Sequence, residues 1–251
     1  MKTLAILQAR MSSRRLPGKV MKIVNDKPMI GWQIARINST KSINKLVIAT
    51  SNDQTDLILS NYLEKENHAV HRGSLVDVHS RFYEIIESNP GFEIVVRLTG
   101  DCPFVMPDIV DSVVAHLVEN NLDYVCNTNP PTYPDGLDVE AFTSDAFLRM
   151  SNLELNSSDL EHVTLKFRTN PEEFALGNIQ NNTNLSSHRW TVDYPQDLNF
   201  VRGIFKKFSG RECEFSVQEV LDLLILHPEL NNQLTGTLRN VSLNNLEDDF
   251  N

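Results

Sequence analysis

The chain has 251 residues, 41% of them hydrophobic, and a formal net charge of −10. This hydrophobic fraction can fill a core, which excludes broad disorder, and the acidic balance argues against a nucleic-acid partner, which needs a broad basic surface. Apolar runs stay far below the roughly 18 residues of a membrane helix, so we expect no membrane insertion. Three widely spaced cysteines form no disulfide framework, and we expect a cytoplasmic protein.

Short runs rich in Val and Ile alternate with helical patterns in the first half of the chain. We predict strands at 4–8, 45–50, 69–71, 92–98 and 124–127, with helices at 28–37, 53–65, 77–87 and 107–119. Asp53 and Asp77 suit helix N-caps, and Pro28 and Pro107 suit first helical turns. The alternation predicts an α/β fold with a mostly parallel central sheet and helices on both faces. Ligands of such sheets bind at the carboxyl ends of the strands.

The second half is less regular. A Pro-rich loop at 129–136 precedes a candidate strand at 137–142, and helices are predicted at 158–168, 195–207 and 216–226. Capping boxes at Ser158/Glu161 and Ser216/Glu219 support two of these helices. We therefore expect one domain over 1–230, with a smaller α+β embellishment, and a C-terminal tail at 231–251 that frays or docks on a partner.

Four cations gather in one short loop directly after the first strand: Arg10, Arg14, Arg15 and Lys19. Backbone N–H groups of a turn bind anions, Arg forks phosphate oxygens, and Lys adds a point charge. The alternative is a solvated basic loop. The placement in an acidic chain favours a triphosphate cradle. The residues expected to contact the nucleotide here are Ala9, Arg10, Ser12, Ser13, Arg14 and Lys19.

Asp101 follows the predicted strand 92–98 and so lies at the same sheet edge as the cationic loop. Mg²⁺ prefers one or two carboxylates, with phosphate oxygens and waters as its other ligands. We predict that Asp101 binds Mg²⁺, the alternative being a simple turn. Asp193 lies similarly before the helix 195–207, where it could instead be the N-cap, with Asp197 a charge of the first turn.

Further polar residues could contact the substrates. Asp135, Asp138 and Glu140 surround a Gly turn and could accept hydrogen bonds from a sugar, or form a polar turn leading into a strand. Alternation would place Asp138 and Glu140 on one face. Arg72 and Arg81 could reach the base or ribose of a nucleotide, or remain solvated.

The run 8–20, QARMSSRRLPGKV, resembles the signature of the sugar-acid cytidylyltransferases. Within these it is most similar to the SpsF-like branch of spore coat polysaccharide biosynthesis, which is related to the acylneuraminate and ketodeoxyoctulosonate cytidylyltransferases. Further matches follow in order at 72–81, 97–103, 134–140, 161–164 and 189–193. Together these segments cover the chain from about residue 4 to residue 225.

The resemblance implies a GT-A-like nucleotide-binding fold, CTP as the donor, Mg²⁺ as the cofactor and a sugar, typically a sugar acid, as the acceptor, for surface polysaccharide synthesis. It makes Asp193 the second metal carboxylate beside Asp101 and adds Arg97 to the nucleotide contacts. It places Glu161 and His162 near the acceptor, although Glu161 is also the predicted capping-box residue. It further implies a homodimer, formed through the segment 128–190.

The resulting hypothesis is a cytidylyltransferase that moves CMP from CTP to a sugar hydroxyl and releases pyrophosphate. Its catalytic residues are Arg10, Lys19 and Asp101, because nucleotidyl transfer needs mainly positioning and charge neutralisation. A GT-A glycosyltransferase with a nucleotide-sugar donor is the nearer alternative. A non-catalytic nucleotide-binding homologue is the farther one.

Overall fold

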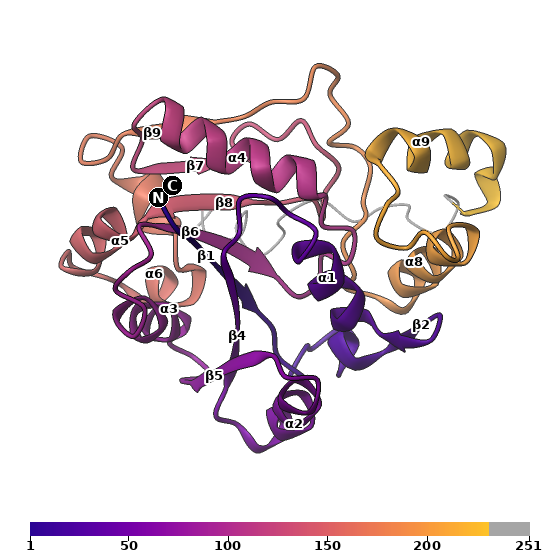
Figure 1. The fold of residues 1–251 in the computed structure, drawn as a ribbon, viewed down its shortest axis with the longest axis horizontal. Helices are drawn as coiled ribbons and strands as arrows, with labels where there is room; N and C mark the ends of the chain where they lie inside the picture. The colour runs from indigo at the N-terminus through magenta and orange to yellow at the C-terminus, as the bar shows by residue number, and fades with distance from the viewer. Residues whose placement is uncertain (231–251) are drawn as a thin grey trace.

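The computed structural model describes residues 1–230. Within them, a seven-stranded sheet of order β5-β4-β1-β6-β8-β7-β9 runs through the molecule, and β2 and β3 form a separate small hairpin (Figure 1). The strands are β1 (Thr3–Gln8), β2 (Ile23–Val24), β3 (Lys27–Pro28), β4 (Lys45–Ser51), β5 (Ala69–Gly73), β6 (Ile94–Thr99), β7 (Tyr124–Cys126), β8 (Glu140–Thr143) and β9 (Leu176–Asn178). The five strands predicted in the first half therefore all exist, with ends displaced by one or two residues.

Most strand pairs in this sheet are parallel. β1 pairs in parallel with both β4 and β6, β4 with β5, and β7 with β9, whereas β8 runs antiparallel to β6 and β7. Gln8, the last residue of β1, is in register with Ala49 of β4 and Thr99 of β6. The segments that follow β1 and β6 therefore start side by side at the carboxyl edge. The prediction of a mostly parallel α/β sheet is confirmed.

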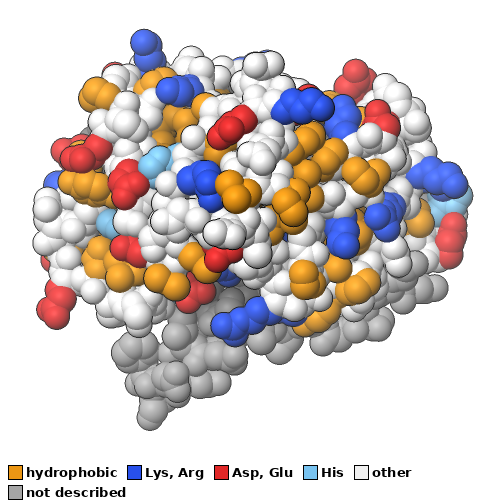
Figure 2. Space-filling view, turned by 90° about the horizontal axis from the view of Figure 1, so that it is seen from below, with side chains coloured by type: hydrophobic (Ala, Val, Ile, Leu, Met, Phe, Trp, Pro, Cys, Tyr) orange, Lys and Arg blue, Asp and Glu red, His pale blue; other side chains and the backbone are white. Residues whose placement is uncertain are grey.

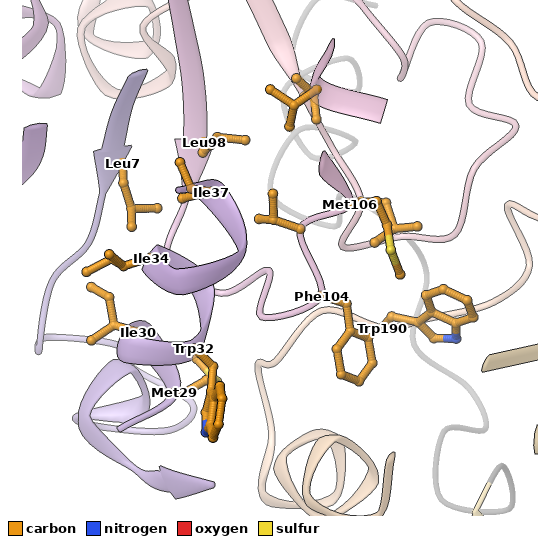
Figure 3. Packing of buried hydrophobic residues seen from close by; sticks show 14 of the residues in the cluster. Leu7, Met29, Ile30, Trp32, Ile34, Ile37, Leu98, Phe104, Met106 and Trp190 are labelled. Atoms are coloured by element: carbon orange, nitrogen blue, oxygen red, sulfur yellow. The ribbon is translucent and has the colours of Figure 1, made fainter. Parts of the chain in front are cut away.

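Helices cover both faces of the sheet. They are α1 (Met29–Ile37), α2 (Leu57–Lys65), α3 (Val78–Glu87), α4 (Pro107–Glu119), α5 (Ser144–Ser151), α6 (Ser157–His162), α7 (Leu165–Thr169), α8 (Pro195–Lys207) and α9 (Val217–Leu226). Buried side chains of α1, α2, α4, α8 and α9 share one hydrophobic cluster. Those of α3, α5 and α7 share a second cluster on the other face. The α1 side is shown in Figure 3, where Ile30 and Ile34 point toward Leu7 of β1.

The predicted helix starts are largely correct. Asp77 accepts a hydrogen bond from the N–H of Ser80 at the start of α3, and Pro107 is the first residue of α4. Asp53 caps the short 3₁₀ helix Gln54–Asp56 that precedes α2. The capping box of α9, Ser216 with Glu219, is present as predicted.

Three predictions in the second half are wrong in detail. The expected helix 158–168 is two helices, α6 and α7, separated at Val163, whose φ is 52°. The capping box of α6 is Asn156 with Asp159, which precedes the predicted Ser158/Glu161 pair. The candidate strand 137–142 begins only at Glu140, because residues 134–138 turn back toward the segment 188–191.

Several expectations concern the surface. Among residues 1–230, none of the helices has the length and apolar character to span a membrane. On the face seen in Figure 2, Lys and Arg side chains are scattered among acidic and hydrophobic ones. The three cysteines are free thiols. The predicted tail, 231–251, lies outside the described residues.

Candidate active site at the carboxyl ends of the central strands

The cationic loop leaves the end of β1 and folds back on itself. The carbonyl of Met11 accepts hydrogen bonds from the N–H groups of Ser13, at 2.9 Å, and Gly18, at 2.8 Å. Gly18 has a φ of 67°, a left-handed conformation that favours glycine, and it starts the 3₁₀ turn Lys19–Met21. Arg10 and Arg14 are exposed on this loop, whereas Lys19 is buried. The loop therefore buries one cation, Lys19, and leaves Arg10 and Arg14 facing solvent.

Lys19 bridges the two predicted metal carboxylates. Its ammonium Nζ donates to Asp101 Oδ2 and Asp193 Oδ1, both at 3.1 Å, and to the carbonyl of Val192 at 2.7 Å. Burial by itself lowers the pKa of Lys19, but the two carboxylates outweigh it and the pKa is raised. Burial likewise favours the neutral form of Asp101, yet Lys19 and the hydroxyl of Thr99 hold the pKa of Asp101 well below its usual range. The pKa of Asp193 is lowered too, so all three groups are charged at neutral pH.

Backbone contacts bring Asp101 and Asp193 together from distant parts of the chain. The N–H of Val192 donates to the carbonyl of Asp101 at 2.8 Å, and Trp190 packs edge-on against Phe104, with ring centroids 6.0 Å apart. Gly100 lies so close to β1 that a Cβ there would be 2.9 Å from the Cβ of Ala9. Glycine is therefore the residue that lets the Asp101 turn lie against the cationic loop.

Two further arginines complete this charge cluster. Arg189 donates to Asp135 at 2.9 Å and to Asp193 at 2.7 Å, and lies 3.5 Å from Asp197. Arg15 contacts the other oxygen of Asp193 at 2.7 Å. Both arginines belong to the motifs of the sequence, but the sequence predicts no pairing of either with a carboxylate. The sequence signal for the ion pair of Arg189 with Asp193 is their spacing of four residues. The sequence does not show the direction of the Arg189 side chain.

The alternative role of Asp193 as an N-cap is wrong. The N-cap of α8 is Tyr194, and the backbone N–H groups of Asp193 and Tyr194 both donate to the carboxylate of Asp197, at 2.7 and 2.8 Å. Asp197 is thus the helix-start charge, as predicted, and the side chain of Asp193 remains directed at the cation cluster.

The donor set fits a hard divalent cation. Within the described part of the chain, no three His, Cys, Asp or Glu side chains gather into a metal site of their own. Asp101 and Asp193 instead present two carboxylate oxygens to one position, which the ammonium of Lys19 holds. Two carboxylates completed by phosphate oxygens and waters are the arrangement that Mg²⁺ accepts in nucleotide sites.

A second buried network lies beside this cluster. Arg97 of β6 forms an ion pair with Glu140 of β8, and Glu140 also accepts hydrogen bonds from Tyr124, at 2.5 Å, and Thr164, at 2.7 Å. Burial disfavours the charge of Glu140, but Arg97 lowers its pKa to about 2. Arg97 also donates to Gln8 at 3.1 Å. The sequence predicts both Arg97 and Glu140 as substrate contacts, and in the structure they contact each other.

The predicted acceptor pair is at the end of α6. Burial lowers the pKa of His162, the charge of Glu161 opposes this, and the charge of Arg97 adds to it. Arg97 also interacts electrostatically with Asp101, so one arginine connects the environment of His162 to the charge cluster. Asp138 lies close enough to Cys102 to influence that buried thiol, whose pKa is raised mainly by burial.

The two remaining arginines differ. Arg72 donates to the backbone carbonyls of Ser51 and Asp53, each at 3.2 Å. Arg81 is buried, and burial together with the nearby charge of Arg10 lowers its pKa to about 10. Its Nε is buried without a hydrogen-bond partner. Arg81 therefore lies beside the cationic loop with hydrogen-bonding capacity to spare.

Comparison with known proteins identifies the family and the fold of the chain. The sequence model of a family described as "Cytidylyltransferase" matches residues 4–201. The chain belongs to the cytidylyltransferase family. This cytidylyltransferase-family chain is 31% identical to the spore coat polysaccharide biosynthesis protein SpsF of Bacillus subtilis (strain 168) over 234 residues, which is 90% of the chain and 95% of that protein.

Solved structures agree with this assignment. A cytidylyltransferase from Leptospira borgpetersenii serovar Hardjo-bovis (strain JB197) superposes with a TM-score of 0.87 at 26% identity, covering 95% of this chain and 99% of that one. A CMP:2-keto-3-deoxy-manno-octonic acid synthetase complexed with CTP has the same fold, with a TM-score of 0.64 at 17% identity, covering 82% of this chain and 99% of that one. The predictions of the family, the fold and a CTP-dependent nucleotidyltransferase are confirmed, while the roles of single residues stay predictions.

Proposed function

We propose that this cytidylyltransferase transfers CMP from CTP to a hydroxyl of a sugar acid, with release of pyrophosphate, in the synthesis of a surface polysaccharide. One observation carries the proposal. The inward cation of a loop otherwise lined by exposed arginines joins two carboxylates from distant parts of the chain at the carboxyl edge of the sheet. A triphosphate with its cation needs both kinds of group at one place.

The loop residues bind and orient the triphosphate. Arg10 and Lys19 hold the β- and γ-phosphates and stabilise the leaving pyrophosphate, since phosphoryl and nucleotidyl transfer depend on positioning and on neutralising charge. The loop residues Ala9, Ser12, Ser13 and Arg14 contribute further contacts to the nucleotide. Arg81, with its unpartnered Nε, reaches the nucleotide from the side of α3, whereas Arg72 supports the β4 end through backbone carbonyls.

Asp101 and Asp193 hold Mg²⁺ in this proposal. The bound cation would neutralise phosphate charge and make an acceptor hydroxyl easier to ionise. Lys19 then moves from the carboxylates to the phosphates, and Arg15 and Arg189 keep Asp193 oriented through the contacts they already make. The carboxylate of Asp193 is thereby oriented before the nucleotide arrives.

The acceptor lies on the side of the second network. Glu161 and His162 face the acceptor from the end of α6. Burial lowers the pKa of His162 and so favours its neutral form. A group that takes a proton from a hydroxyl must be neutral in this way. Asp138 offers a hydrogen-bond acceptor to the sugar from the turn at Gly136, whereas Asp135 supports this turn through its ion pair with Arg189. Glu140 and Arg97 act by supporting this side, because their charges are already paired with each other.

The test begins with binding. Thermal stabilisation by CTP, UTP, GTP and ATP, each with Mg²⁺, should be selective for CTP, and a ligand at a hundred times its dissociation constant adds about 2.7 kcal/mol. Pyrophosphate release is then measured with a panel of sugar acids and neutral sugars. Release of a nucleoside diphosphate from nucleotide sugars would instead favour the glycosyltransferase alternative. No shift with any triphosphate would refute the cradle.

We further propose that residues 1–230 form one catalytic domain, that the protein is a homodimer through the segment 128–190, and that it acts in the cytoplasm. Strand β9 of this segment lies at the edge of the sheet, and an edge strand offers unpaired backbone groups to a partner. The free cysteines suit a reducing compartment. Elution as a monomer in gel filtration at micromolar concentration would remove the dimer.

A further inference from the structure

The chain makes a strained turn between α6 and α7. Val163 has φ 52° and ψ −55°, and the N–H of Thr164 donates to the carbonyl of His162 at 2.5 Å. This is the geometry of a γ-turn of the rare, strained kind. Positive φ is unfavourable for a β-branched residue, and such a conformation persists only when its surroundings enforce it.

The surroundings of this turn are buried and specific. Val163 and Thr164 are each 1% exposed, and Val163 belongs to the hydrophobic cluster that includes Phe167. The hydroxyl of Thr164 donates to Oε1 of Glu140 at 2.7 Å. A hydrogen bond from a neutral hydroxyl to a buried carboxylate is one of the stronger kinds. The turn is therefore fixed at Thr164 by a charged group of the central sheet.

That charged group is itself connected to the cationic loop. Glu140 pairs with Arg97, and Nε of Arg97 donates to Oε1 of Gln8 at 3.1 Å. Gln8 is the last residue of β1, directly before the loop. An unbroken series of side-chain contacts thus runs from the start of the loop to the turn that ends α6.

We propose that Thr164 is a positioning residue, whose hydrogen bond to Glu140 holds the γ-turn at Val163 and thereby places His162 relative to the cationic loop. This inference rests on the proposed function, in which His162 faces the sugar acceptor. The alternative conformation of this turn is helical, because the sequence pattern of 158–168 favours one continuous helix. When the bond to Glu140 is lost, Val163 relaxes toward the helical region and His162 changes its direction.

The experiment compares three variants. Thr164→Val keeps the shape and removes the donor, and Thr164→Ser restores the donor. The matched control is Tyr124→Phe, which removes a hydroxyl from the same oxygen, Glu140 Oε1, without touching the turn. Steady-state pyrophosphate release gives KM for CTP and for the acceptor. The titration of His162 is followed by NMR, with the signal assigned through His162→Gln.

The expected result is specific to one variant and one substrate. Thr164→Val should raise the acceptor KM or lower kcat by at least tenfold, leave the KM for CTP within about twofold, and move the His162 titration. Thr164→Ser should restore both readouts, and Tyr124→Phe should change neither by more than about threefold. The charged groups that surround His162 are Glu161, Arg97, Arg168 and Glu140, and all of them are kept in these variants.

Two outcomes would overturn the inference. One is a Thr164→Val protein with unchanged acceptor kinetics and an unchanged His162 titration, and the other is an equal loss in Thr164→Val and Tyr124→Phe, which would indicate a general structural role. Should Thr164→Val melt before assay, Thr164→Ala removes the same donor with less crowding and decides the same question. Where the wild-type chain releases no pyrophosphate at all, the proposed function fails, and the His162 titration still tests the turn.

Discussion

Replacing Lys19 with methionine should change metal and nucleotide binding in opposite directions. The ammonium of Lys19 lies where Asp101 and Asp193 converge, so in the free protein it competes with any cation for these carboxylates. Methionine has a similar length and keeps the buried stem packed, but it removes the charge. The variant should bind Mn²⁺ or Mg²⁺ more tightly in the absence of nucleotide, and CTP more weakly.

The geometry sets the size of both effects. Each contact of 3.1 Å between unit charges corresponds to about 5 kcal/mol at an effective dielectric constant of about 20. Desolvation of the buried groups cancels most of this attraction, and Arg15 and Arg189 continue to neutralise Asp193. A net release of about 1–2 kcal/mol corresponds to about 5–30-fold tighter metal binding. Loss of a charged hydrogen bond to phosphate costs about 1.5–3 kcal/mol, or roughly 10–150-fold in CTP affinity.

The assay is titration calorimetry of the purified protein with Mn²⁺ alone and then with CTP in the presence of Mg²⁺. Lys22→Met is the matched control, because Lys22 is exposed and only three residues away, so it removes the same charge without touching the carboxylates. Tighter Mn²⁺ binding in the Lys19 variant with near wild-type values in the control supports the reasoning. Weaker Mn²⁺ binding in Lys19→Met would refute it, since the two carboxylates would then not share one cation position.

Three further predictions concern the parts that support the site. Arg36 is fully buried and donates hydrogen bonds to three backbone carbonyls, each of which is costly to leave unpaired. Arg36→Met should therefore lower the free energy of unfolding, measured by urea denaturation, by about 3–5 kcal/mol. A loss below about 1 kcal/mol would contradict this reasoning. The carboxylate of Asp56 accepts a hydrogen bond from the N–H of Met11 at 2.6 Å. Asp56→Ala should therefore loosen the cationic loop and weaken CTP binding about tenfold, as measured by calorimetry. An unchanged CTP affinity would show that Asp56 does not support the loop. Glu140 has a folded pKa of about 2, below its ordinary 4.5, so the unfolded chain binds a proton first as the pH falls. Its contribution of about 3 kcal/mol is complete above about pH 5 and lost toward pH 2, and Glu140→Gln should flatten this part of the urea-midpoint profile, whereas an identical slope would count against the assignment.

Local patterns are sufficient to predict the elements that carry the site. β1 is a continuous apolar run with polar residues at its ends, and β6 has the same pattern except for Arg97. Such runs are typical of buried parallel strands. Because the carboxyl ends of neighbouring parallel strands share one edge, the sequence alone places the cationic loop and Asp101 together. The resemblance of the motifs then brings Asp193 to the same position.

Other features depend on competition between local and distant contacts. The pattern of 158–168 favours one helix, yet Val163 breaks it because Thr164 bonds to Glu140 of a strand that precedes it in the chain. Arg72 is a second residue whose role depends on contacts that the sequence does not show. Its charge suggests a ligand contact, but backbone carbonyls at the end of β4 accept its hydrogen bonds.

The amino-acid sequence by itself determined that a basic loop follows the first strand, that carboxylates follow later strands, and that these belong to a cytidylyltransferase-like chain. Only the tertiary structure decided which charges meet. Lys19 lies 82 residues from Asp101 and 174 from Asp193, and sequence separation carries no information on side-chain direction. The pairing follows from the register of β1 with β6 and from the packing of Trp190 on Phe104, which are properties of the assembled core.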